Sequence, residues 1–115
     1  MNIQIFGTKK CFDTKKAERY FKERRIKYQL IDVVKFGMSQ GEFRSVKSAL
    51  KLKCDGLIDE KKLDDNTILV KYLSSEEEKE NYILEHQQII KTPIVRDGKK
   101  ATLGYCPEVW KNWEG

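Results

Sequence analysis

The chain has 115 residues, a length that fits one compact domain and leaves no room for a second. Its composition, 39% hydrophobic and 36% charged, predicts a single core beneath a charged surface, and no run of about 18 apolar residues is present to span a membrane. The net charge of +5 comes partly from scattered Lys-Lys pairs, without the gathered basic face of a nucleic-acid-binding protein. We therefore expect one domain over residues 1–115, with no membrane or nucleic-acid partner.

The N-terminal segment has the pattern of a strand, a helix and a second strand. Residues 2–6 alternate apolar and polar side chains, and residues 28–34 form another apolar, β-branched run. Between them, residues 12 to about 24 place Ala17 and Phe21 on one helical stripe. A single helix between two strands predicts that the strands are parallel. The opening residues lack the longer apolar stretch of a signal peptide, so we expect a cytoplasmic protein.

The middle of the chain is predicted to be helical. Ser39 and Glu42 have the spacing of a capping box, which predicts a helix over 40–50 with Phe43 and Val46 on one face. Further elements are expected in chain order: a short helix and turn within 51–63, a short helix over 68–73, and a glutamate-rich helix from the serines at 74–75 to about residue 90.

The last quarter predicts a hairpin followed by a helix. Residues 94–96 begin with the apolar, β-branched pair Ile94-Val95 and predict a strand, the pair Asp97-Gly98 is a strong turn signal, and residues 101–105 return as the partner strand. Pro107 suits the first turn of a closing helix. The order β-α-β, helices, β-β-α is that of an α/β, thioredoxin-like fold, with a four-stranded mixed sheet and a helical insertion at about 39–90 between the two halves.

Cysteines are the residues most able to carry chemistry. Cys11, Cys54 and Cys106 are widely separated, and an odd number without an export signal does not predict a disulfide framework. With His86 they are also the candidate zinc ligands, but no two of the four lie two to four residues apart, so we expect no metal. Free cysteines are by default buried and inert, so each is judged on its surroundings.

Cys11 stands between a predicted strand and a predicted helix. Unpaired amides at a helix N-terminus stabilise a thiolate, and the neighbouring lysines at 9, 10, 15 and 16 would lower its pKa further. Thr14 lies three residues on, where its hydroxyl can reach the sulfur, whereas Asp13 has the opposite charge effect. We expect a reactive thiol here, the alternative being a structural cysteine beneath the loop.

The pair Thr92-Pro93 is, after Cys11, the second sequence feature that indicates a functional site. The proline opens a strand, and an X–Pro bond adopts the cis form at little cost, so either isomer fits the sequence. In the predicted fold this turn would face Cys11 and expose backbone groups to an extended peptide substrate.

These segments resemble the arsenate-reductase-related (ArsC/Spx/YffB-like) family. Residues 5–17, IFGTKKCFDTKKA, resemble its cysteine loop, in which Cys-x-x-Ser/Thr or Cys-x-x-Cys heads the first helix. Residues 91–99, KTPIVRDGK, are similar to its cis-proline strand, and residues 103–105 with Pro107 to its second hairpin arm and last helix. The resemblance covers essentially the whole chain.

The resemblance implies a thiol-dependent oxidoreductase that forms a mixed disulfide with a glutathione-like or protein disulfide substrate. The implied site consists of the Cys11 nucleophile, Thr14 on its sulfur, Lys9, Lys10 and Lys15 as a positive field for an anionic substrate, Thr92 and Pro93 as the docking backbone, and Cys106 as a candidate resolving thiol. No bound cofactor is expected; glutathione is the expected co-substrate and glutaredoxin a candidate partner.

Two departures from the family pattern limit which of the family's functions we expect of this chain. Arsenate reductases of this family hold the oxyanion with arginines, and this chain has Thr92 and Cys106 at two of those positions, with a third falling near residues 57–59. We therefore do not expect arsenate reduction. Spx-type regulators bind RNA polymerase and often sense oxidation through Cys-x-x-Cys, where this chain has Thr14. The alternative function is a non-enzymatic adaptor for RNA polymerase or another protein.

Overall fold

A four-stranded mixed sheet forms the centre of the computed structural model, which describes residues 1–114. Its strands are β1 (Ile3–Gly7), β2 (Tyr28–Asp32), β3 (Ile94–Asp97) and β4 (Lys100–Leu103), in the order β2-β1-β3-β4. β1 and β2 are parallel and β3 and β4 form an antiparallel hairpin, as the sequence predicted, and β1 also pairs antiparallel with β3. Because β1 pairs with β3, the loop after β1 lies beside the turn before β3.

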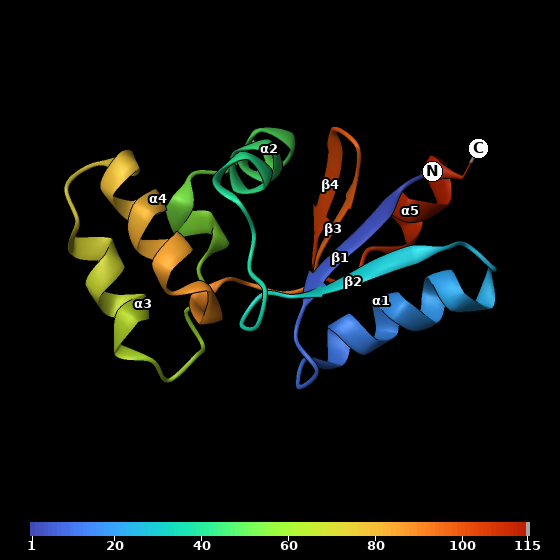
Figure 1. Cartoon of the computed structure of the whole chain (residues 1–115), viewed down its shortest axis with the longest axis horizontal. Helices are drawn as coiled ribbons and strands as arrows, with labels where there is room; N and C mark the ends of the chain where they lie inside the picture. The colour runs from blue at the N-terminus through green and yellow to red at the C-terminus, as the bar shows by residue number, and fades with distance from the viewer. Residues whose placement is uncertain (115) are drawn as a thin grey trace.

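One face of the sheet is covered by α1 (Phe12–Glu23) and α5 (Pro107–Trp113) (Figure 1). The apolar stripe of α1 packs with Ile3 and Ile5 of β1 and with the fully buried Trp110 of α5. The indole Nε1 of Trp110 donates a hydrogen bond to the Thr102 hydroxyl at 2.7 Å, which satisfies the polar atom of this large core residue.

The other face carries α2 (Gln40–Leu50) and the rest of the insertion. That part consists of η1 (Cys54–Leu57), α3 (Asp65–Leu69), η2 (Val70–Tyr72), α4 (Glu76–Glu85) and η3 (Gln87–Ile89). Figure 1 shows α2, α3 and α4 on the opposite side of the sheet from α1 and α5. The Ser39–Glu42 capping box is present at the start of α2, and Phe43 and Val46 are fully buried. None of the described helices is long and apolar enough to cross a membrane.

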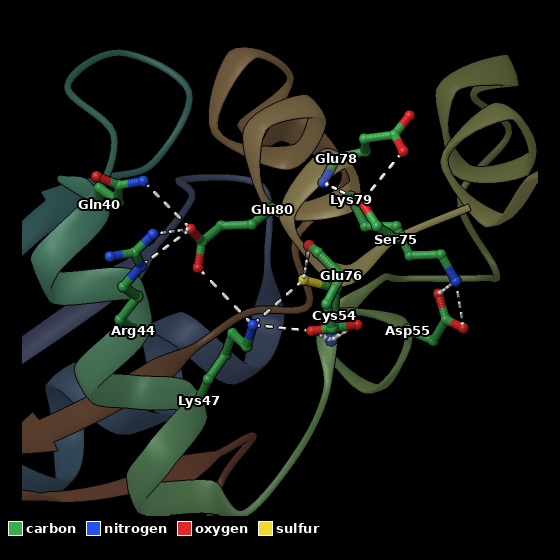
Figure 2. A network of polar contacts seen from close by, with 10 residues as sticks. All are labelled: Gln40, Arg44, Lys47, Cys54, Asp55, Ser75, Glu76, Glu78, Lys79 and Glu80. Carbon is green, nitrogen blue, oxygen red and sulfur yellow. Dashed lines mark hydrogen bonds and ion pairs between the residues drawn. The ribbon is translucent and has the colours of Figure 1, made fainter. Parts of the chain in front are cut away.

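An ion-pair network joins α2, η1 and α4 within the insertion (Figure 2). Lys47 Nζ lies 2.8 Å from a Glu76 carboxylate oxygen and 3.7 Å from one of Glu80. Glu80 is 4% exposed and also accepts from Arg44 at 3.0 Å. Glu76 in turn accepts the backbone N–H of Cys54. The network therefore provides charge partners for a buried carboxylate and fixes η1 against both helices.

The boundaries differ from the sequence prediction in three places. α4 ends at Glu85 instead of near residue 90, because Gln87 donates to and accepts from the backbone of Met38, and because Ile90 turns to pair with Ile58. The short helix predicted over 68–73 begins at Asp65, where Asp64 accepts from Asn66 N as its cap. The hairpin turn lies one residue later than expected, since Asp97 pairs with Lys100 and Gly98 has φ 61°.

Candidate active site around Cys11

Cys11 is the residue from which α1 begins. Its φ and ψ of −86° and 118° are extended, its N–H donates to Thr8 O at 3.2 Å, and its carbonyl accepts from Lys15 N. The half-buried side chain therefore lies at the N-terminus of a twelve-residue helix, where unpaired amides and the helix dipole favour an anion.

The strand order brings Cys11 to the turn before β3. The thiol Sγ donates to the carbonyl oxygen of Thr92 at 3.5 Å, across 81 residues of sequence. The Thr92–Pro93 peptide bond is cis, and Pro93 is buried. Cys11, Thr92 and Pro93, which the sequence marked separately, thus form one site.

Thr14 lies beneath this thiol. Its side chain is 1% exposed, and its hydroxyl has no hydrogen-bond partner among the described residues. Gly7 at the end of β1 makes this burial possible, because a Cβ at that position would collide with the Thr14 side chain. The unpartnered hydroxyl is available to the sulfur of Cys11. Sequence reasoning singled out Thr14 but missed Gly7, for which the tight strand-to-helix connection was the available signal.

The pKa of Cys11 lies below its ordinary value. Burial raises the pKa, but the Thr14 and Thr92 side chains and the backbone amides of Thr14 and Asp13, which can all donate to a thiolate, outweigh that effect. A larger thiolate fraction at neutral pH follows, and the thiolate is the nucleophilic form.

The lysines near Cys11 in sequence point in different directions. Lys9 lines a hollow with Leu30 and Phe36 beside β2, and Lys15 lies over the ring of exposed Phe12 at 5.8 Å. Lys10 is exposed in the loop. None of the three is among the described residues that line the cleft beside Thr92.

That cleft has a volume of about 450 Å³ and joins the two halves of the fold. It is lined by Asp13 of α1, by Lys91, Thr92, Leu103 and Gly104 of the hairpin region, and by Asp59, Glu60 and Lys61 of the insertion. The resemblance had placed a third anion-binding position of the family near residues 57–59, whereas Glu60, Lys61 and Lys91 were missed by sequence reasoning. Lys91 adjoins the Thr92-Pro93 signal, whereas no local pattern places 59–61 near Cys11.

The other two cysteines have raised pKa values. Cys106 begins α5, and burial together with the charge of Asp13 raises its pKa; its thiol donates to Leu103 O at 3.3 Å. Cys54 is fully buried, and burial together with its contact to Glu76 raises its pKa to about 11. Cys11 is therefore the only described cysteine whose surroundings favour the thiolate.

A mixed sheet with this strand order, helices on both faces, and a thiol at the start of the first helix beside a cis-proline define a protein of thioredoxin-like fold. The model of the ArsC family matches residues 6–113. The chain belongs to the ArsC family, as the resemblance predicted.

Solved structures agree with this assignment at the level of the fold. An arsenate reductase from Vibrio cholerae has a TM-score of 0.83 at 20% identity, with 97% of each chain covered. A Bacteroides fragilis protein described as related to the ArsC family has a TM-score of 0.80 at 16% identity and 97% coverage of both chains. A YffB protein has a TM-score of 0.76 at 20% identity, with 96% of each covered. A search of curated protein sequences found no significant match.

Proposed function

We propose that this protein is a monothiol oxidoreductase. The observation that carries the proposal is the Cys11 thiol, held at the start of α1 beside the Thr92 backbone with a lowered pKa and an otherwise unpartnered Thr14 hydroxyl. The Cys11 thiolate attacks one sulfur of a disulfide, which forms the Cys11–substrate bond, breaks the substrate S–S bond and expels the other half as a thiolate. A second thiolate, from glutathione or a glutaredoxin-type protein, then attacks the substrate sulfur and releases Cys11 as a thiolate.

Arsenate is not the proposed substrate. The described lining of the cleft beside Cys11 contains lysines and no arginine, and an ammonium cannot reproduce the bidentate grip of a guanidinium on an oxyanion. Thr92 also stands where a guanidinium would adjoin the cis-proline. We place the activity in the cytoplasm, where glutathione and related systems keep thiols reduced.

The alkylation rate of Cys11 as a function of pH tests the proposal. In a Cys54→Ala/Cys106→Ala background we expect an apparent pKa below the unperturbed thiol value of about 8.5. Thr14→Val should raise this pKa and slow alkylation at pH 7, because it removes a donor to the thiolate while keeping the shape, whereas Thr14→Ser should restore it. A pKa at or above the unperturbed value in the background protein would contradict the proposal.

Cys106 is expected to contribute little to turnover. A resolving thiol must itself ionise to attack the mixed disulfide, and burial raises the pKa of Cys106. Cys106→Ser should therefore keep most of the turnover supported by excess glutathione. A large loss of turnover, together with a Cys11–Cys106 disulfide in the oxidised wild-type protein found by mass spectrometry, would instead assign the resolving role to Cys106.

A second candidate function is a protein adaptor, for which RNA polymerase is the partner that the resemblance implies. Phe12 and Phe36 are 79% and 73% exposed, and each has a lysine ammonium over its ring, so both rings are available to a protein partner. This function does not need the thiol. Binding to purified RNA polymerase should then survive Cys11→Ser and weaken in Phe12→Ala or Phe36→Ala.

A further inference from the structure

Cys11 does not itself line the cleft, but two residues that adjoin it, Thr92 and Asp13, do. Thr92, whose carbonyl oxygen is 3.5 Å from Cys11 Sγ, forms one wall, and Asp13, two residues after Cys11, forms another. Asp59 and Lys61 complete the cleft from the insertion. A group attached to Cys11 that extends past Thr92 therefore meets the side chains that line this volume.

The wall contributed by the insertion is held by backbone hydrogen bonds to the segment that leads into β3. Ile58 pairs with Ile90 in an antiparallel bridge. Asp59 N donates to Ile89 O at 2.8 Å, and Lys91 N donates to Leu57 O at 2.8 Å. The charges of Asp59 and Lys91 are thus carried on segments held together next to the Thr92 turn.

The cleft contains charged side chains of both signs that do not form strong ion pairs within the protein. The Glu60 carboxylate already forms an ion pair with Lys71 Nζ, at 2.6 Å. Asp13 has only a 4.0 Å contact with Lys16, with both side chains about half exposed, and Asp59 accepts only the backbone N–H of Lys61. Lys61 and Lys91 form no ion pair with any described residue. Two carboxylates and two ammonium groups therefore remain available to a ligand.

We propose that this cleft selects thiols and disulfides that carry an ammonium and a carboxylate near the sulfur, as an amino acid does, over those that carry a negative charge alone. Asp13 and Asp59 receive the ammonium group, and Lys61 and Lys91 receive the carboxylate. The inference rests on the proposed disulfide exchange at Cys11. It replaces the expectation that Lys9, Lys10 and Lys15 attract a purely anionic substrate, since those lysines lie outside the cleft lining.

The test uses four symmetric disulfides and the full-length Cys54→Ala/Cys106→Ala protein, whose only thiol is Cys11. The probes are cystine, which carries both charges, cystamine, which is cationic, dithiodipropionate, which is anionic, and the neutral bis(2-hydroxyethyl) disulfide. Mass spectrometry measures the second-order rate of mixed-disulfide formation. Each rate is divided by the rate with the neutral probe, which cancels changes in the thiolate fraction of Cys11. The same ratio is measured for the free thiol N-acetylcysteine amide with the same probes, and dividing by it cancels differences between the leaving groups.

We expect cystine to exceed dithiodipropionate about three- to tenfold on this corrected scale, the size that two partly exposed ion pairs supply. Lys61→Met/Lys91→Met should move the preference toward cystamine, and Asp13→Asn/Asp59→Asn toward dithiodipropionate. Lys99→Met, at the hairpin turn on the opposite end of β3, is the matched control and should leave the preference unchanged.

Each contrary outcome has a separate meaning. Equal corrected rates with all four probes, a preference for dithiodipropionate, or an equal change in Lys99→Met would overturn the charge selection while leaving the thiol chemistry in place. Failure of Cys11 to form a mixed disulfide with any probe, including the neutral one, would overturn the oxidoreductase function itself.

Discussion

Replacing Cys11 by serine is expected to lower the rate of disulfide exchange by at least about a thousandfold, a loss typical of removing a catalytic nucleophile. A serine hydroxyl at this position is neutral at pH 7, and it cannot form the mixed disulfide through which the reaction passes. The Thr92 carbonyl and the Thr14 hydroxyl would remain in place, so the change isolates the sulfur. Turnover of bis(2-hydroxyethyl) disulfide with excess glutathione is the measurement.

Cys54→Ala provides the matched control for this loss. Cys54 is fully buried with a raised pKa, so its removal should leave the exchange rate close to that of the wild-type protein. If Cys11→Ser instead retained the full rate, the chemistry would not depend on this thiol, and the adaptor function would become the better account of the molecule.

Replacing Lys47 by methionine is expected to lower the free energy of unfolding at pH 7 by about 2–4 kcal/mol, because it leaves the buried Glu80 and the partly exposed Glu76 without their shared cation. Figure 2 shows Lys47 pointing between Glu76 and Glu80. Glu80 is 4% exposed, and although Arg44 still reaches it, its second oxygen would lose its only described cation. Urea unfolding at fixed pH gives the measurement.

Lys79→Met is the matched control for this prediction. Lys79 pairs with Asp55 at 3.0 Å, but that carboxylate is 54% exposed, so its loss should cost less than about 1 kcal/mol. Equal destabilisation by the two variants would show that the buried Lys47 network stabilises the fold no more than an exposed ion pair does.

The same network predicts an acid-sensitive stability. Burial raises the pKa of Glu76, but hydrogen bonds from Lys47 and from Cys54 outweigh this and lower it to about 2, from an ordinary value of 4.5. A carboxyl whose pKa is lower in the folded protein stabilises it above pH 4.5, and this contribution is lost as the pH falls from about 4.5 to about 2. At 40% exposure we expect about 1–2 kcal/mol from it. Lys47→Met should flatten the acid limb of the stability profile, and an unchanged limb would contradict the assignment.

The elements that the sequence predicted correctly depend on interactions between near neighbours. The stripe containing Ala17 and Phe21 defines α1, the Ser39–Glu42 capping box starts α2, and Pro107 opens α5. Hydrogen bonds and packing over three or four residues are visible in a local pattern. The position of Cys11 at a helix start is of the same kind, and so is its spacing to Thr14.

Features that depend on residues far apart in the chain could not be predicted from local sequence patterns. The end of α4 at Glu85 follows from Gln87 binding the backbone of Met38, 49 residues away. The contact of Cys11 with Thr92 exists because β1 pairs with β3, and the sequence anticipated it only through the predicted fold. The charged cleft exists because Ile58 pairs with Ile90.

The sequence by itself therefore determined the fold class and the family, and it singled out Cys11 as the candidate nucleophile, because each of these is encoded within short segments. Only the tertiary structure decided which charges line the cleft next to Thr92. Lys9, Lys10 and Lys15 are its neighbours along the chain, yet the insertion and Lys91 supply the cations that line the cleft. Proximity in sequence does not fix the direction of a side chain, whereas strand pairing and the docking of the insertion do.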